Sequence, residues 1–244
     1  MKDQKGAVLP LIWPTEKTQS MFAFLVTHRE TPIRRETLIE TLWPGFPKDR
    51  ASINFRTTAS RMRQTISKVF SRQVDRQQIF VCHQGKYQLL PDIQFHVDSD
   101  EFTLLLKEAE RASSPEEKAK IIEQALTLYK GDYLPEIYDS WTDVLRRSLR
   151  ERRLSALHWL AQYAKEQGNN FGCITACESY LSVEPLSEEI ARIYMMCLAH
   201  TGRLAAVKAY YTSFQQRLRK ELCSSPSAKT QDLYRSLLQS RSAQ

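Results

Sequence analysis

The stretch RASINFRTTASRMRQTISKVFSR, residues 50–72, contains six basic residues and no acidic residue. Its apolar residues recur at steps of three and four, and an amphipathic helix buries a stripe of this kind. The residues predicted to be buried are Phe55, Ala59, Met62, Ile66 and Val69. The pattern predicts a helix that directs one face into a core and a basic face outward.

The outward face of this helix carries basic and hydrogen-bonding side chains. Arg, Gln, Asn and Thr hydrogen-bond to base edges, and Lys and Arg also bind phosphates. The candidate base-reading residues are Asn54, Thr57, Arg61 and Gln64. The candidate phosphate-binding residues include one lysine from a predicted hairpin: Arg50, Arg56, Arg63, Lys68, Arg72 and Lys86. The alternative is a solvated surface helix, but such helices usually interleave charges of both signs.

The net charge of the chain is confined to its first part. Residues 1–97 contain 15 Lys and Arg against 8 Asp and Glu, whereas residues 98–244 contain 20 of each kind. The entire formal net charge of +7 therefore belongs to the first part. A basic region joined to a neutral one indicates that one domain binds a polyanion and that the other has a different task.

The composition argues against several other classes of protein. No apolar run approaches the roughly 20 residues that a membrane-spanning helix needs, and no signal-peptide pattern is present, so we expect a cytoplasmic protein. The five cysteines include no C-x-x-C pair, which favours buried thiols over disulfides or a zinc site. Glycine-rich phosphate loops and nucleophile elbows are also missing. We therefore expect no catalytic residues, no metal and no cofactor.

The first part of the chain shows the element order of a winged helix-turn-helix. Two short helices are predicted before the basic helix, at about 18–28 and 34–43, and a proline-rich loop follows the second. Two β-prone runs come next, at 79–82 and 87–90, with a glycine between them that suits a tight hairpin. We assign residues 1–97 to a winged-helix DNA-binding domain.

From residue 98 onward the pattern is helical throughout. Asp98 and Glu101 are predicted as a capping pair for the first of these helices. Further helices are predicted at 115–130, 139–167, 170–183, 187–201, 203–222 and 227–239. ALHWLAQYAKEQG, ending at Gly168, aligns with ARIYMMCLAHTG, ending at Gly202, at the 34-residue period of tetratricopeptide repeats. The predicted fold is mainly α, with the winged helix followed by an all-α tetratricopeptide-like domain at 98–244.

Six stretches, taken in order, together point to a known family. The stretches are LIETLWP at 38–44, ASINFRTTASRMRQTI at 51–66, IFVCHQGKYQL at 79–89, VDSDEF at 97–102, IEQALTLYKGDYLPE at 122–136 and RLRKELCSSPSAKTQDLY at 217–234. In this order they resemble bacterial transcriptional activators of the SARP type, a family that joins an OmpR-like winged helix to an all-helical bacterial transcriptional activator domain. The resemblance implies that the basic helix enters the major groove, that the hairpin contacts the minor-groove side, and that the helical domain supports dimerisation and activation. The implied partners are double-stranded DNA with direct repeats, RNA polymerase and a second copy of the chain.

The N-terminus departs from the family pattern. Members usually begin with several β-strands, whereas about 17 residues precede the first predicted helix here. This length leaves room for one strand at most. We therefore expect the N-terminal sheet to be reduced or truncated.

Two alternative functions fit parts of the sequence. A helical-repeat scaffold, or a ligand-responsive adaptor, would carry its basic end only incidentally, but it has no need of a helix-turn-helix. An RNA-binding adaptor usually stacks bases on exposed aromatic rings. The basic helix has none on its outward face, because Phe55 and Phe70 are predicted on the buried side. A DNA-binding transcriptional activator is the favoured interpretation.

Overall fold

The chain divides into two compact units, each made of two segments. The computed structural model describes residues 11–69, 79–89 and 95–239. The units are Met1–His96 with Leu134–Leu145, and Val97–Tyr133 with Arg146–Gln244. The predicted helical domain, residues 98–244, includes residues 134–145, whereas in the structure this returning segment packs with the first unit.

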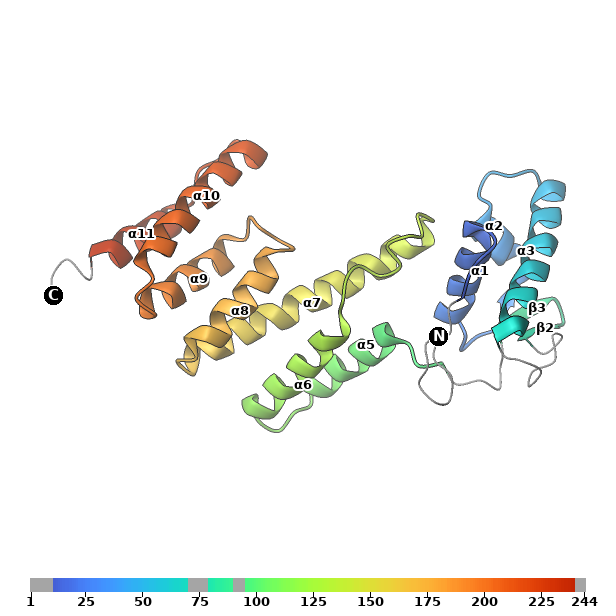
Figure 1. Cartoon of the computed structure of the whole chain (residues 1–244), viewed down its shortest axis with the longest axis horizontal. Coiled ribbons are helices and arrows are strands. Elements are labelled where there is room, and N and C mark those ends of the chain that lie inside the picture. The colour runs from blue at the N-terminus through green and yellow to red at the C-terminus, as the bar shows by residue number, and fades with distance from the viewer. Residues whose placement is uncertain (1–10, 70–78, 90–94, 240–244) are drawn as a thin grey trace. The chain divides into compact units, whose positions relative to one another are not determined.

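The first unit is built on three helices and a small antiparallel sheet (Figure 1). The helices are α1 (Glu16–Thr27), α2 (Arg35–Leu42) and α3 (Lys48–Val69), and the strands are β1 (Ile33–Arg34), β2 (Phe80–His83) and β3 (Lys86–Leu89). The strand order is β1-β3-β2. This arrangement is the predicted winged helix-turn-helix. Residues 1–10, where the reduced N-terminal sheet was expected, lie outside the described residues.

The three helices and the hairpin share one apolar core. Its fully buried large side chains are Met21, Leu25, Leu38, Leu42, Met62, Ile66, Ile79, Phe80 and Leu89. The loop after α2 turns at Gly45, whose φ of 77° is a conformation that side chains other than glycine rarely adopt. The predicted proline-rich loop therefore separates α2 from α3 as expected.

All regular secondary structure among the described residues of the second unit is helical (Figure 1). Its helices are α5 (Asp98–Ala109), α6 (Pro115–Leu128), most of α7 (Trp141–Glu166), α8 (Asn170–Leu181), α9 (Glu188–His200), α10 (Leu204–Leu222) and α11 (Ala228–Gln239). Each corresponds to a predicted helix, with ends that differ by a few residues. The predicted fold class, mainly α with a winged helix followed by a helical domain, is confirmed.

The predicted capping role of Asp98 is wrong. Val97 is the N-cap of α5, it makes no side-chain capping bond, and Asp98 is the first residue of the helix. Asp98, Asp100 and Glu101 all lie in the first turn, where carboxylates stabilise the positive end of the helix dipole. The acidic cluster is therefore explained by the helix dipole and not by a capping pair.

The 34-residue repeat is visible in the packing of the second unit. Gly168 and Gly202 each follow a helix with positive φ, 68° and 78° respectively. Ala161 and Met195 occupy equivalent places in α7 and α9, and both are 0% exposed. Cys173 is likewise fully buried in α8. The helix pairs α7–α8 and α9–α10 thus repeat one packing unit, as tetratricopeptide-like helices do.

The returning segment, residues 134–145, is bound to α1 by hydrogen bonds and a ring contact. Asp139 accepts a bond from Lys17 Nζ at 2.5 Å and another from the Ser20 hydroxyl. The Trp141 indole donates to Ser20 Oγ at 3.3 Å, and its ring meets that of Phe24 edge-on at 5.1 Å between centroids. The first turn of α7 is therefore part of the first unit, while the rest of the helix belongs to the second.

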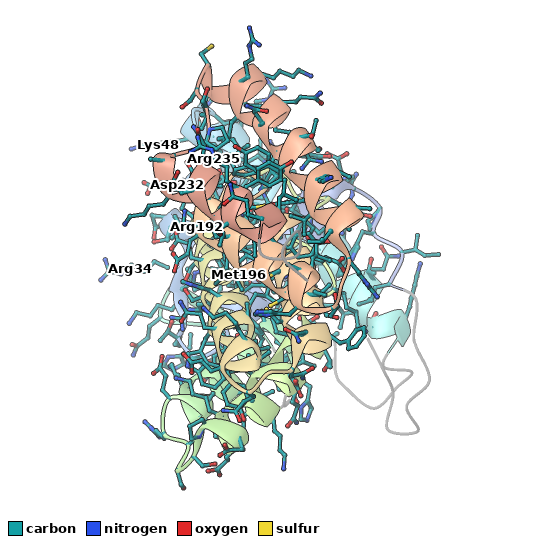
Figure 2. All side chains as sticks on the ribbon, turned by 90° about the vertical axis from the view of Figure 1, so that its left-hand side faces the viewer. Arg34, Lys48, Arg192, Met196, Asp232 and Arg235 are labelled. Carbon is teal, nitrogen blue, oxygen red and sulfur yellow. The ribbon has the colours of Figure 1, made fainter. Side chains whose placement is uncertain are left out.

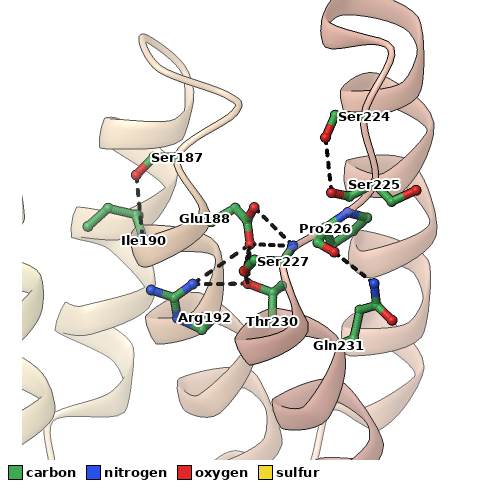
Figure 3. A network of polar contacts seen from close by, with 10 residues as sticks. All are labelled: Ser187, Glu188, Ile190, Arg192, Ser224, Ser225, Pro226, Ser227, Thr230 and Gln231. Atoms are coloured by element: carbon green, nitrogen blue, oxygen red, sulfur yellow. Dashed lines mark hydrogen bonds and ion pairs between the residues drawn. The ribbon is translucent and has the colours of Figure 1, made fainter.

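Glu188 at the start of α9 holds the start of α11 (Figure 3). Its carboxylate accepts bonds from the Ser227 backbone N–H at 3.1 and 3.0 Å and from the Thr230 hydroxyl at 2.5 Å. Arg192 donates to Thr230 Oγ1 at 3.0 Å and lies 3.8 Å from the Glu188 carboxylate. Burial acts to raise the pKa of Glu188, but these donors outweigh it, so the pKa lies below its ordinary value.

We expect Glu188→Gln to weaken the attachment of α11. A carboxyl group whose pKa falls on folding stabilises the native state at pH values above the ordinary pKa of the group, which is about 4.3. This stabilisation is lost as the pH falls through the lower pKa of the folded state. The variant should lose about 1 kcal/mol at neutral pH, as for a lost helix cap, and converge with the wild type in acid. Urea denaturation at several pH values tests this, with the exposed Glu166→Gln as control. A difference that stays constant with pH would contradict it.

Candidate nucleic-acid interface

The buried face of α3 is the one predicted from the sequence. Phe55, Ala59, Met62 and Ile66 are all at most 2% exposed. They pack into the core of the first unit, so the opposite face of α3 is directed away from that core. The side chain of Val69, the last residue of the predicted stripe, lies outside the described residues.

The outward face of α3 presents the candidate contact residues. The exposed ones are Arg50, Arg56, Thr57, Arg61, Gln64 and Lys68. Asn54 is half-buried, and Arg72 lies outside the described residues. Within the described part of the chain, no ion pair engages Arg56, Arg61 or Lys68. These cations are therefore available to an external anion.

Two arginines link α3 to α2 and to strand β2. Arg35 at the start of α2 donates to Ser52 Oγ at 2.5 Å, and its guanidinium lies 5.4 Å from the centre of the Phe55 ring. Arg63 donates to the Phe80 carbonyl at 3.0 Å, and its guanidinium lies 5.1 Å from the Phe80 ring. This contact ties α3 to strand β2, and the predicted phosphate contact of Arg63 would have to use the guanidinium N–H groups that remain.

The wing is a tight hairpin between β2 and β3. Gln84 and Gly85 both have positive φ, 51° and 75°, which is the geometry of a two-residue turn that follows the twist of the strands. The predicted four-residue connection is therefore shorter in the structure, because His83 and Lys86 pair with each other as strand residues.

Three basic residues lie in one row beside the tip of the wing. Lys86 in the central strand is opposite His83 of β2 and Arg34 of β1. Directly opposite residues project from the same face of a sheet. All three are exposed, and Figure 2 shows Arg34 extending away from the ribbon. Arg34 is not among the residues predicted from the sequence, because the pairing of β1 with β3 joins residues that no local pattern connects.

The three buried cysteines of the helical unit offer little nucleophilic reactivity. Cys173, Cys177 and Cys197 are fully buried, and a bond with Cys177 together with burial raises the pKa of Cys173 to about 12. A thiol is nucleophilic only as the thiolate. In the described part of the chain, no three His, Cys, Asp or Glu side chains are grouped to bind a metal ion. No described helix is long and apolar enough to span a bilayer.

Comparison with known proteins identifies the family of the chain. Residues 97–238 match the model of the bacterial transcriptional activator domain. The chain belongs to this family. The transcriptional regulatory protein MoaR1 of Mycobacterium tuberculosis (strain ATCC 25618 / H37Rv) is 25% identical over 239 residues, which cover 96% of this chain and 75% of that protein. The MoaR1 protein of Mycobacterium bovis (strain BCG / Pasteur 1173P2) is equally similar.

A solved structure shares the fold of most of this chain. Mycobacterium tuberculosis EmbR, determined in complex with a low-affinity phosphopeptide, superposes with a TM-score of 0.69 at 18% identity. The match covers 96% of this chain and 62% of that one. This likeness establishes the fold. Together with the family match it confirms the resemblance to SARP-type regulators, a class of transcriptional regulators and not of enzymes.

Proposed function

We propose that this family member is a sequence-specific, double-stranded DNA-binding transcriptional activator that acts in the cytoplasm. The observation that carries the proposal is the outward face of α3, which is basic, free of carboxylates from residue 50 onward and fixed by a fully buried opposite face. A helix of this kind fits the major groove, where base edges differ in their donors and acceptors.

The residues of the interface divide into readers and anchors. Asn54, Thr57, Arg61 and Gln64 are proposed to contact base edges. The proposed anchors on phosphates are Arg50, Arg56, Lys68, Arg72 and Lys86, to which the wing row adds Arg34. Phosphate contacts supply affinity and position, whereas base contacts supply specificity. Arg63 is left out of both groups, because its guanidinium is bound to strand β2.

The helical unit is proposed to provide dimerisation on direct repeats and the contact with RNA polymerase. Its formal charge is balanced, with 20 basic and 20 acidic residues from residue 98 onward, so it offers no electrostatic reason to bind DNA. In this division of labour residues 1–97 bind DNA and residues 98–244 bind proteins. The returning segment is the exception, because it completes the first unit.

Selection from a pool of random DNA duplexes tests the proposed function. The full chain should enrich one sequence motif, repeated in the same orientation if two copies bind together. Binding to the enriched site should weaken with salt, and each neutralised phosphate adds about 0.9 to the log–log slope. The six proposed anchors predict a slope of magnitude about 5 per copy. Failure to enrich any motif would contradict sequence-specific reading.

A ligand-responsive adaptor is the second candidate function, favoured by a groove in the helical unit. The groove lies between α6, α7 and α8 and has a volume of about 660 Å³. Apolar residues such as Leu126, Leu157 and Leu160 line it, with Arg153 and Glu123 among its polar residues. Helical-repeat surfaces of this kind bind partners. A folded chain that enriches no DNA motif would favour this function over the first.

A further inference from the structure

One large apolar side chain lies on the outward face of α3. Ile53 is 62% exposed, whereas the apolar residues of the opposite face are at most 2% exposed. It belongs to none of the core clusters that the described residues form. Exposed isoleucines are common on protein surfaces, so exposure alone carries no meaning. The position of Ile53 among its neighbours on the helix is the informative feature.

Ile53 shares a row with the residues at the centre of the candidate interface. Thr57, Ser60 and Gln64 follow it at steps of four, three and four, which keeps all four on one face of a helix. Thr57, Ser60 and Gln64 are also exposed. At 3.6 residues per turn, Arg56 falls on one side of this row and Arg61 on the other. The isoleucine is therefore flanked by cations that attract a polyanion.

An apolar side chain at this place has one complementary group in the major groove. Of the four bases, only thymine presents a methyl group there, on C5, while the other features are hydrogen-bond donors and acceptors. We propose that Ile53 recognises the 5-methyl group of a thymine in the target site. The inference rests on the proposed function, since it requires α3 to lie in the major groove.

The size of the effect follows from the buried methyl group. Removing one buried methyl-sized group typically weakens an interaction about three- to fivefold. A discrimination of this size is smaller than that of a bidentate hydrogen-bonding pair. Ile53 is thus expected to refine the preference at one base pair and not to determine whether the protein binds.

The test replaces single thymines of the selected site by deoxyuridine. This change removes only the 5-methyl group and keeps base pairing and the O4 acceptor. Wild-type protein should bind the duplex with one particular replacement about three- to fivefold more weakly. Ile53→Ala should bind that duplex and the unmodified duplex equally, while Ile53→Val should retain part of the difference. Exposure of the residue makes all three proteins comparable in fold, which circular dichroism and thermal unfolding verify.

Replacements at the remaining thymines serve as the matched control. They should affect the wild type and Ile53→Ala alike, because other side chains or DNA shape would be responsible there. Equal responses of the two proteins at every thymine, or a selected site without thymine, would overturn the assignment of Ile53 while leaving the proposed function intact. A wild-type chain that selects no site at all would instead overturn the proposed function.

Discussion

Met62→Ala should lower the free energy of unfolding of the first unit by about 2–5 kcal/mol. Met62 is 0% exposed and lies in the middle of the buried stripe of α3, within the core shared by the three helices and the hairpin. Truncation removes apolar contacts and leaves a cavity that the surrounding side chains fill only partly. Urea denaturation of the full chain, followed by a signal from the first unit, measures the loss.

The neighbouring residue provides the matched control for this prediction. Arg61 is adjacent in sequence but exposed, so Arg61→Ala should change the free energy of unfolding by no more than about 0.5 kcal/mol. DNA binding by Met62→Ala should fall in proportion to the unfolded fraction. Unchanged stability of Met62→Ala, with a loss for Arg61→Ala, would mean that α3 faces the opposite way in solution.

The buried and exposed faces of α3 could be predicted because apolar residues close together in the sequence recur with the period of a helix. Phe55, Ala59, Met62 and Ile66 follow one another at steps of four, three and four, and each turned out to be buried. The 34-residue repeat could be recognised in the sequence for a similar reason. Equivalent positions such as Ala161 and Met195 are apolar and fully buried in α7 and α9. Local spacing is thus sufficient wherever one element alone determines which side chains are inside.

Features that depend on contacts between distant segments could not be predicted in this way. Nothing in the spacing of residues 134–145 shows that Asp139 and Trp141 bind α1 and not the helical unit. Arg34 joins the wing row only through the pairing of β1 with β3. Arg63 lies in the basic stretch like the proposed anchors, yet the nearby Phe80 carbonyl binds its guanidinium. Charge and spacing identify a candidate surface, whereas tertiary partners decide which of its cations remain available.

The second large effect concerns the distinction between reading and anchoring on α3. Arg61 and Lys68 are both exposed, and no ion pair with another described residue engages either of them. Arg61 lies near the middle of the helix, where a guanidinium can bind a guanine edge with two hydrogen bonds, worth about 1–3 kcal/mol of discrimination. Lys68 lies in the last turn and carries a compact charge that suits a phosphate.

Arg61→Ala should therefore weaken binding to the selected site by about 10-fold or more. For a scrambled duplex, the affinity of the variant should differ much less from that of the wild type. Lys68→Ala should weaken both duplexes by the same factor and lower the magnitude of the salt slope by about one. Titrations of both variants on both duplexes at two salt concentrations separate the two roles. An equal loss for Arg61→Ala on both duplexes would assign this arginine to the phosphates as well. Sequence reading would then have to come from Asn54, Thr57 and Gln64, whose side chains carry no charge to attract any duplex indiscriminately.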